Sequence, residues 1–256
     1  MSLLRVEKMN MSFGGIHALE DISFTVNQGA IHSIIGPNGA GKTTLFNLIT
    51  GVYTPSAGRI LFNEQDITNV PTYALAGYGI SRTFQNLQIF FNMSAVENVM
   101  VGNHIQTDSR FLPALFGLPS IKRGERACRE RAEQIMCEVG LEKFIGSDAD
   151  SMPYGALKWL EIARALASEP DMLLLDEPAA GLNPSETGEI NDLIKRVAEK
   201  GITVILVEHD MKLVMGVSDH ILVLDSGRKL AEGTAEEIRQ NPNVIEAYLG
   251  HRRRAR

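Results

Sequence analysis

Apolar residues in the second half of the chain come in short unbroken runs. Three of them, MLLLDE, ITVILVEH and HILVLDSG, occupy 172–177, 202–209 and 220–227. Runs of this length without polar alternation are typical of parallel strands that are buried on both faces of a sheet. Segments with helical spacing separate these runs, at 185–200 and 211–217. Strands that alternate with helices predict right-handed crossovers and an α/β fold with a parallel sheet.

The first half of the chain has shorter strand-like runs between turns. These runs lie at 22–26, 30–35 and 59–63, and glycine and proline residues mark the turns around them. A glycine-rich loop follows the second run, and TTLFNLIT at 43–50 then has the pattern of a helix that Gly51 closes. This half therefore contains a strand, a loop and a helix in direct succession.

The middle of the chain, from about 98 to 167, has a helical pattern of its own. At 122–144, charged residues surround apolar residues at helical spacing, among them Ala132 and Ile135. The stretch at 111–121 resembles an insertion or a surface loop. We therefore expect a helical subdomain within a chain that is otherwise α/β.

These patterns predict one domain over the whole chain, 1–256. The segments at about 1–97 and 168–256 form its α/β part, and the helical subdomain at about 98–167 is set between them, with an insertion near 103–124. No internal repeat is visible in the sequence.

Composition and charge narrow the function classes. The chain has 256 residues, of which 44% are hydrophobic and 22% charged, and this content excludes a mainly disordered protein. A net charge of −6 argues against a protein that binds nucleic acid duplexes, which needs clustered lysine and arginine. Two cysteines cannot make a disulfide framework or a four-ligand zinc site. We therefore expect an intracellular globular protein that has no nucleic acid partner.

One motif points to phosphate chemistry. GPNGAGKT matches G-x-x-x-x-G-K-[ST] between an apolar strand and a helix, the context that confirms a phosphate-binding loop. Its glycines let backbone N–H groups approach phosphate oxygens, Lys42 supplies a charge, and the Thr43 hydroxyl suits Mg²⁺. We expect a nucleoside triphosphate to contact the following residues: Gly36, Pro37, Asn38, Gly39, Ala40, Gly41, Lys42, Thr43 and Thr44.

Two adjacent acids end the apolar run at 172–177. In the Walker-B arrangement the first carboxylate, Asp176, helps to hold Mg²⁺. The second, Glu177, points to the opposite side of the strand end, where it can accept a proton from a water that attacks the γ-phosphate. The sequence thus predicts hydrolysis of the bound triphosphate and Glu177 as its base.

Together these motifs resemble the nucleotide-binding subunit of an ABC transporter over essentially the whole chain. The resemblance implies a P-loop NTPase fold with a RecA-like core, an antiparallel β subdomain and an α-helical subdomain. It implies ATP and Mg²⁺ as cofactors. It also implies roles for Gln85 in SRTFQN, which senses the γ-phosphate and contacts the metal, and for His209 in VEHDM, which clamps the γ-phosphate. Phe13 matches the aromatic residue that stacks on adenine, and Lys42 acts in catalysis as well as in binding.

The resemblance also implies that one chain contacts ATP held by another. The segment MPYGA at 152–156 occupies the place of LSGGQ, which caps the ATP of the opposite subunit. Pro153 replaces the serine and has neither a hydroxyl nor a backbone N–H, whereas the N–H groups of Tyr154 and Gly155 can face an anion. Relatives with a similar segment carry Gln and Arg-Arg where this chain has Leu-Lys-Trp at 157–159.

Finer motifs, including FGGIHAL, LEIARALA and a terminal NPNVIEAYLG, are similar to the LivG-type subunit of branched-chain amino acid importers. This implies two transmembrane permease subunits, a second nucleotide-binding subunit of LivF type or a second copy, and an external substrate-binding protein. It implies a peripheral position at the cytoplasmic face of the inner cell membrane.

Four alternatives remain open: an importer of urea or amides, an ATPase of another ABC system such as lipopolysaccharide export, a soluble ABC ATPase, and a regulatory subunit that does not hydrolyse ATP.

Overall fold

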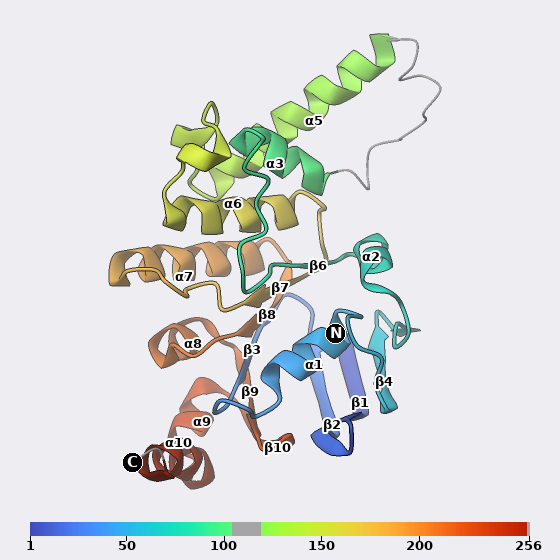
Figure 1. The fold of residues 1–256 in the computed structure, drawn as a ribbon, viewed down its shortest axis with the longest axis vertical. Helices are drawn as coiled ribbons and strands as arrows, with labels where there is room; N and C mark the ends of the chain where they lie inside the picture. The colour runs from blue at the N-terminus through green and yellow to red at the C-terminus, as the bar shows by residue number, and fades with distance from the viewer. Residues whose placement is uncertain (104–118, 255–256) are drawn as a thin grey trace.

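The computed structural model describes residues 1–103 and 119–254, which form two sheets and a set of covering helices (Figure 1). Six strands make the larger sheet, in the order β10-β9-β3-β8-β7-β6. All neighbours in it are parallel except β9 and β10. The strands are β3 (Ile31–Ile35), β6 (Ile80–Arg82), β7 (Met172–Asp176), β8 (Thr203–Val207), β9 (His220–Asp225) and β10 (Arg228–Gly233). The predicted parallel α/β sheet is confirmed.

A second, antiparallel sheet has the order β2-β1-β4-β5. Its strands are β1 (Ser2–Phe13), β2 (Ile16–Asn27), β4 (Ala57–Phe62) and β5 (Gln65–Asp66). The predicted runs at 22–26 and 59–63 belong to β2 and β4, whereas the sequence analysis missed β1. Lys8 adopts a left-handed conformation with φ 46°, and the pairing of β1 with β2 shifts register between Val6 and Met9. Such a bulge breaks the regular alternation by which a strand is recognised in a sequence.

Helices cover the sheets in two groups (Figure 1). At one end of the molecule α3 (Ala95–Gly102), α5 (Pro119–Glu138) and α6 (Tyr154–Leu166) lie together, and α7 (Pro184–Glu199) lies beside α6. The remaining helices are α1 (Lys42–Ile49), α2 (Thr72–Leu75), α8 (Met211–Val217), α9 (Ala235–Gln240) and α10 (Pro242–Arg254), with 3₁₀ turns at Ala76–Tyr78, Glu142–Phe144 and Ala149–Ser151. Within the described residues, no helix combines the length and apolar character that crossing a membrane requires.

The helix predicted at 122–144 has different bounds in the structure. It begins earlier, at Pro119, inside the stretch taken as an insertion, and it ends at Glu138. Gly140 adopts a left-handed conformation with φ 86°, which ends the helix, and a separate 3₁₀ turn follows. The rest of the predicted insertion, 104–118, lies outside the described residues.

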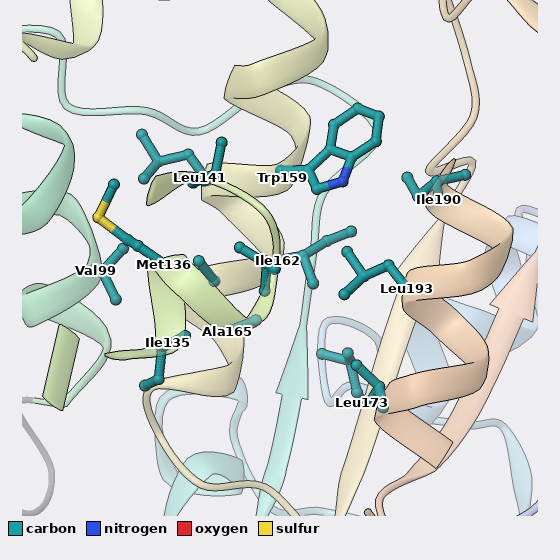
Figure 2. Close-up of a cluster of buried hydrophobic side chains, with 14 of the residues drawn as sticks. Val99, Ile135, Met136, Leu141, Trp159, Ile162, Ala165, Leu173, Ile190 and Leu193 are labelled. Carbon is teal, nitrogen blue, oxygen red and sulfur yellow. The ribbon is translucent and has the colours of Figure 1, made fainter. Parts of the chain in front are cut away.

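Two large apolar clusters pack the helices of the chain against its sheets. One cluster runs from α3 and α5 through α6 to β7 and α7 (Figure 2). Leu160 and Ile162 of α6 are buried in it together with Leu193 of α7, so α6 is packed firmly against the core. The other cluster holds α1, through Leu45 and Phe46, between the two sheets. Burial of this kind anchors the two helices that carry phosphate-loop and signature residues.

Candidate active site

The phosphate loop joins the end of β3 to the start of α1, and its backbone requires glycine at two positions. A Cβ atom on Gly36 would lie 2.1 Å from the carbonyl oxygen of Leu224. Gly41 has φ 99°, and a Cβ there would lie 2.6 Å from Cδ2 of Leu19. No side chain fits either place, so these glycines let the loop lie directly on β9 and β2.

Lys42 is buried at the start of α1 and turns back onto the loop. Its Nζ donates hydrogen bonds to the carbonyl oxygens of Gly36 at 2.7 Å and Pro37 at 3.0 Å. Burial lowers the pKa of Lys42, and the negative charge of Glu177 opposes this effect. The loop thus holds a cation in place where phosphate groups are expected to bind.

Glu177 lies directly after β7 with an unusual backbone. Its φ is 48°, a left-handed conformation that costs a non-glycine residue about 1–3 kcal/mol and that is often found at functional sites. A hydrogen bond from the Glu177 N–H to the carbonyl of Val207, at 2.9 Å, maintains it. The carboxylate lies 2.9 Å from Nε2 of His209 and accepts a hydrogen bond from Nε2 of Gln85 at 3.3 Å. Three predicted residues from separate parts of the chain therefore meet.

A cavity of about 680 Å³ brings these groups together with the phosphate loop. It is lined by Ile16, His17, Ala18, Asn38, Gly39, Ala40, Gly41, Lys42, Thr43, Thr44, Gln85, Glu177, His209, Ser226 and Gly227. The sequence analysis missed five of these residues, which come from the start of β2 and from the turn between β9 and β10. The sequence did not indicate them as site residues, because they reach the cavity through contacts such as the hydrogen bond from the Gly227 N–H to the Ala40 carbonyl.

The side chains predicted to bind the metal supply oxygen atoms of the type that Mg²⁺ prefers. Thr43 and Gln85 line the cavity, whereas Asp176 is 5% exposed and lies at the end of β7. Burial raises the pKa of Asp176, and the guanidinium of Arg82, 4.0 Å away, opposes this effect. A hydroxyl, an amide oxygen and a carboxylate are hard ligands, so this donor set fits Mg²⁺ chemically.

Phe13, Tyr154 and Gly155 lie outside the residues that line the cavity. Phe13 ends β1, is 42% exposed and packs edge-on against Tyr53, with 5.3 Å between the ring centroids. Tyr154 begins α6 and is 48% exposed. Gly155 lies against α7, because a Cβ on it would be 2.8 Å from Oε1 of Glu186. The signature segment of this chain therefore does not line the cavity of the chain's own phosphate loop.

Comparison with protein families gives two matches. The model of the family described as "ABC transporter" matches residues 19–180, which include the phosphate loop, Gln85 and Glu177. The model described as "Branched-chain amino acid ATP-binding cassette transporter" matches residues 228–253, from β10 to α10. The first match alone covers more than half of the chain.

Individual relatives agree with the family matches. The chain is 46% identical to the "High-affinity branched-chain amino acid transport ATP-binding protein BraF" of Pseudomonas aeruginosa, over 97% of this chain and 98% of that one. It is 43% identical to the protein of the same description called LivG in Escherichia coli, with the same coverage.

A crystal structure of an ABC transporter ATP-binding cassette in its ADP conformation has a TM-score of 0.85 and 36% identity, and covers 98% of this chain and 99% of that chain. A nucleotide-free ATP-binding cassette from an ABC transporter has a TM-score of 0.84 and 36% identity, with 97% and 99% covered. These chains share the fold described above over nearly its whole length. The chain therefore belongs to the ABC transporter family of ATPases, in the branch of the branched-chain amino acid ATP-binding cassette transporters.

Proposed function

We propose that this chain binds ATP with Mg²⁺ in the cavity of the phosphate loop and hydrolyses it to drive the import of branched-chain amino acids. The observation that carries the proposal is the meeting of Gln85, Glu177 and His209 in the cavity that Lys42 and the phosphate loop also line. Identity of 43–46% to BraF and LivG over nearly full length supports the cargo class.

The residues divide the work of hydrolysis between binding and proton transfer. Lys42, the loop N–H groups and the N-terminus of α1 bind and orient the triphosphate. Glu177 accepts the proton of the attacking water, and its carboxylate is held in place by Gln85 and His209. His209 also clamps the γ-phosphate. Thr43, Asp176 and Gln85 would hold Mg²⁺, which would supply positive charge beside the phosphate oxygens.

Exposed apolar residues near Gln85 support the proposal of a membrane partner. Phe84, Phe90 and Phe91, which lie close to Gln85 in the sequence, are 38%, 43% and 51% exposed, and Val101 of α3 is 39% exposed, so these apolar residues are a candidate docking surface. We propose that this surface receives a helix from a transmembrane permease subunit. Two permease subunits, a second nucleotide-binding subunit and an external substrate-binding protein complete the importer. The chain then lies at the cytoplasmic face of the cell membrane as a peripheral subunit.

Uptake measurements test the cargo and the chemistry together. Deleting the gene should abolish high-affinity uptake of labelled leucine, isoleucine or valine, and a plasmid copy should restore it. A copy with Glu177→Gln should not restore uptake, because the complex would assemble without turning over ATP. Unchanged uptake after deletion would exclude this cargo, and uptake of labelled urea or an amide should then be measured in the same strain.

Co-purification tests the partners. A tag on this chain in gently solubilised membranes should recover two membrane chains and a second, shorter ATPase. Recovery from the cytosol alone, or together with ribosomes, would contradict a role in transport. The ATPase assignment would stand in either case.

A further inference from the structure

Charged side chains hold the segment that carries Gln85, at 84–90. The backbone N–H of Phe84 donates a hydrogen bond to Oε1 of Glu161 at 3.2 Å, and Arg164 donates one to the carbonyl of Gln88. The ring of Phe84 also lies against Arg82, whose guanidinium carbon is 4.6 Å from the ring centroid. Phe84 is thus held at its backbone and at its side chain by two different charged groups.

Arg82 connects Phe84 to the helix of the phosphate loop. Its Nη1 donates hydrogen bonds to Oγ1 of Thr50 at 2.6 Å and to Oδ1 of Asn47 at 3.3 Å, at the far end of α1. The ring of Phe46, on the same helix, lies 5.1 Å from the guanidinium carbon. A guanidinium can make hydrogen bonds in its plane and stack on rings above and below it, which a lysine cannot do. Arg82 therefore joins α1 to the residue before Gln85.

Glu161 connects Phe84 to the helix of the signature segment. It belongs to α6 and is 2% exposed, between the fully apolar neighbours Leu160 and Ile162. Burial raises the pKa of Glu161, and N–H groups of the segment together with nearby cations oppose this effect. A buried carboxylate is expensive, and an apolar residue of similar volume at such a place is often neutral or stabilising. Packing alone therefore does not explain a glutamate at this position.

We propose that Arg82 and Glu161 are positioning residues, which set the place of Gln85 relative to Glu177 by holding Phe84 from two sides. The inference rests on the proposed function, in which Gln85 and Glu177 act in ATP hydrolysis. Nε2 of Gln85 is 3.3 Å from Oε2 of Glu177, so a small shift of Phe84 breaks this contact. Because Arg82 reaches α1 and Glu161 belongs to α6, both helices determine where Gln85 lies.

Steady-state ATPase kinetics of the purified full chain test the role of Glu161. Glu161→Leu should lower kcat about tenfold, whereas KM for ATP with Mg²⁺ should change by less than about threefold, because the phosphate loop is untouched. Glu161→Gln keeps an oxygen that can accept the Phe84 N–H, and it should restore kcat to within about threefold of the unchanged protein. The matched control is Glu237→Leu, which removes a carboxylate that accepts a backbone N–H from Thr234 at 2.7 Å, far from the site. It should leave kcat unchanged.

A double-mutant cycle tests whether Arg82 acts through Phe84. Arg82→Met should lower kcat less in a Phe84→Leu background than in the unchanged protein, because the ring it holds is then missing and only its contacts with α1 and Asp176 are lost. Additive effects on kcat, or Glu161→Leu with unchanged kcat, would overturn the inference. If Glu161→Leu does not fold, this cycle and the Glu161→Gln variant decide it. Failure of the proposed function has a different signature, since the unchanged protein would then lack ATPase activity or Glu177→Gln would retain it.

Discussion

At the scale of single residues, the proposed roles differ between the groups that would bind phosphate and the group that would take the proton. Glu177→Gln keeps the size of the side chain and should bind ATP normally, but turnover should fall by about 10²–10⁴-fold because an amide cannot accept the proton. Lys42→Met should lose ATP binding itself, since it removes the charge that the loop holds at Gly36 and Pro37. Binding of a fluorescent ATP analogue and phosphate release measure the two effects separately. Normal turnover in Glu177→Gln would show that another group is the base.

His32 gives the molecule a dependence of stability on pH that is unrelated to catalysis. It is buried in β3, and its Nε2 has no hydrogen-bond partner among the described residues. Burial, and to a lesser extent the neighbouring His220, lower the pKa of His32 from 6.5 to about 3. A depressed pKa in the folded state stabilises the protein above pH 6.5, and this contribution is lost progressively as the pH falls from 6.5 toward 3.

The loss should amount to about 1.4 kcal/mol per pH unit below 6.5, or about 2 kcal/mol at pH 5. Urea unfolding at pH 7.5 and pH 5 measures it. His32→Phe can pack against Phe24, whose ring centroid lies 5.5 Å from that of His32, and should remove this part of the pH dependence. The control His17→Gln changes an exposed imidazole and should keep the slope of the unchanged protein. Parallel slopes for His32→Phe and the unchanged protein would contradict the assignment.

At the scale of elements, the start of α7 links a helix cap to the signature segment. Oδ1 of Asn183 accepts hydrogen bonds from the N–H groups of Ser185 and Glu186, and the carboxylate of Glu186 accepts one from the N–H of Asn183, which makes a capping box. The same Glu186 limits the space at Gly155 on α6. The cap therefore stabilises α7 and also fixes the group against which the signature segment packs.

Substitution of this cap should reduce stability without removing the fold. Asn183→Ala should lower the free energy of unfolding by about 1 kcal/mol and Tm by about 2–4 °C, because two N–H groups lose their acceptor. Asn183→Asp keeps an oxygen at the same place and should remain within a few tenths of a kcal/mol of the unchanged protein. Thermal unfolding of both variants measures the difference. Equal losses in the two variants would show that something other than the cap hydrogen bonds stabilises this turn.

The helices and strands of this chain differ in how well the sequence predicts them. The bounds of α8, Met211–Val217, were predicted to the residue, because its apolar spacing is local and Asp210 caps it. The strand β1 was missed because its bulge at Lys8 appears only when it pairs with β2. The end of the helix at 122–144 was misplaced because the pattern beyond Gly140 continues at helical spacing while the backbone does not. Periodicity therefore predicts regular elements and fails where a single residue departs from regular geometry.

At the scale of the whole molecule, the site contains residues that a motif can reveal and residues that it cannot. The phosphate loop, Glu177 and His209 follow buried strands at one edge of a parallel sheet, so their meeting could be predicted once the strands were recognised. Ile16 and Gly227 line the same cavity, yet the sequence around each residue indicates only a strand or a turn and not a contact with the cavity. They reach it because the N–H of Glu20 in β2 donates to the carbonyl of Gly227, which ties the two sheets together. Contacts between segments that are distant in the sequence leave no pattern in the residues around them, so the sequence alone does not predict them.

The last prediction concerns two chains. Tyr154 and Gly155 lie outside the cavity that the phosphate loop lines, and we expect the ATP that they contact to be bound to another chain. ATP should therefore join Glu177→Gln into a dimer, either with itself or with the second nucleotide-binding subunit, because the nucleotide is held without being hydrolysed. Sedimentation with ATP and with ADP measures this association. Tyr154→Ala in the same background removes an exposed aromatic ring and should weaken the dimer about tenfold, or about 1.4 kcal/mol, with ATP binding to the single chain unchanged. A dimer that forms equally with ADP, or that Tyr154→Ala leaves intact, would place the signature segment away from the nucleotide.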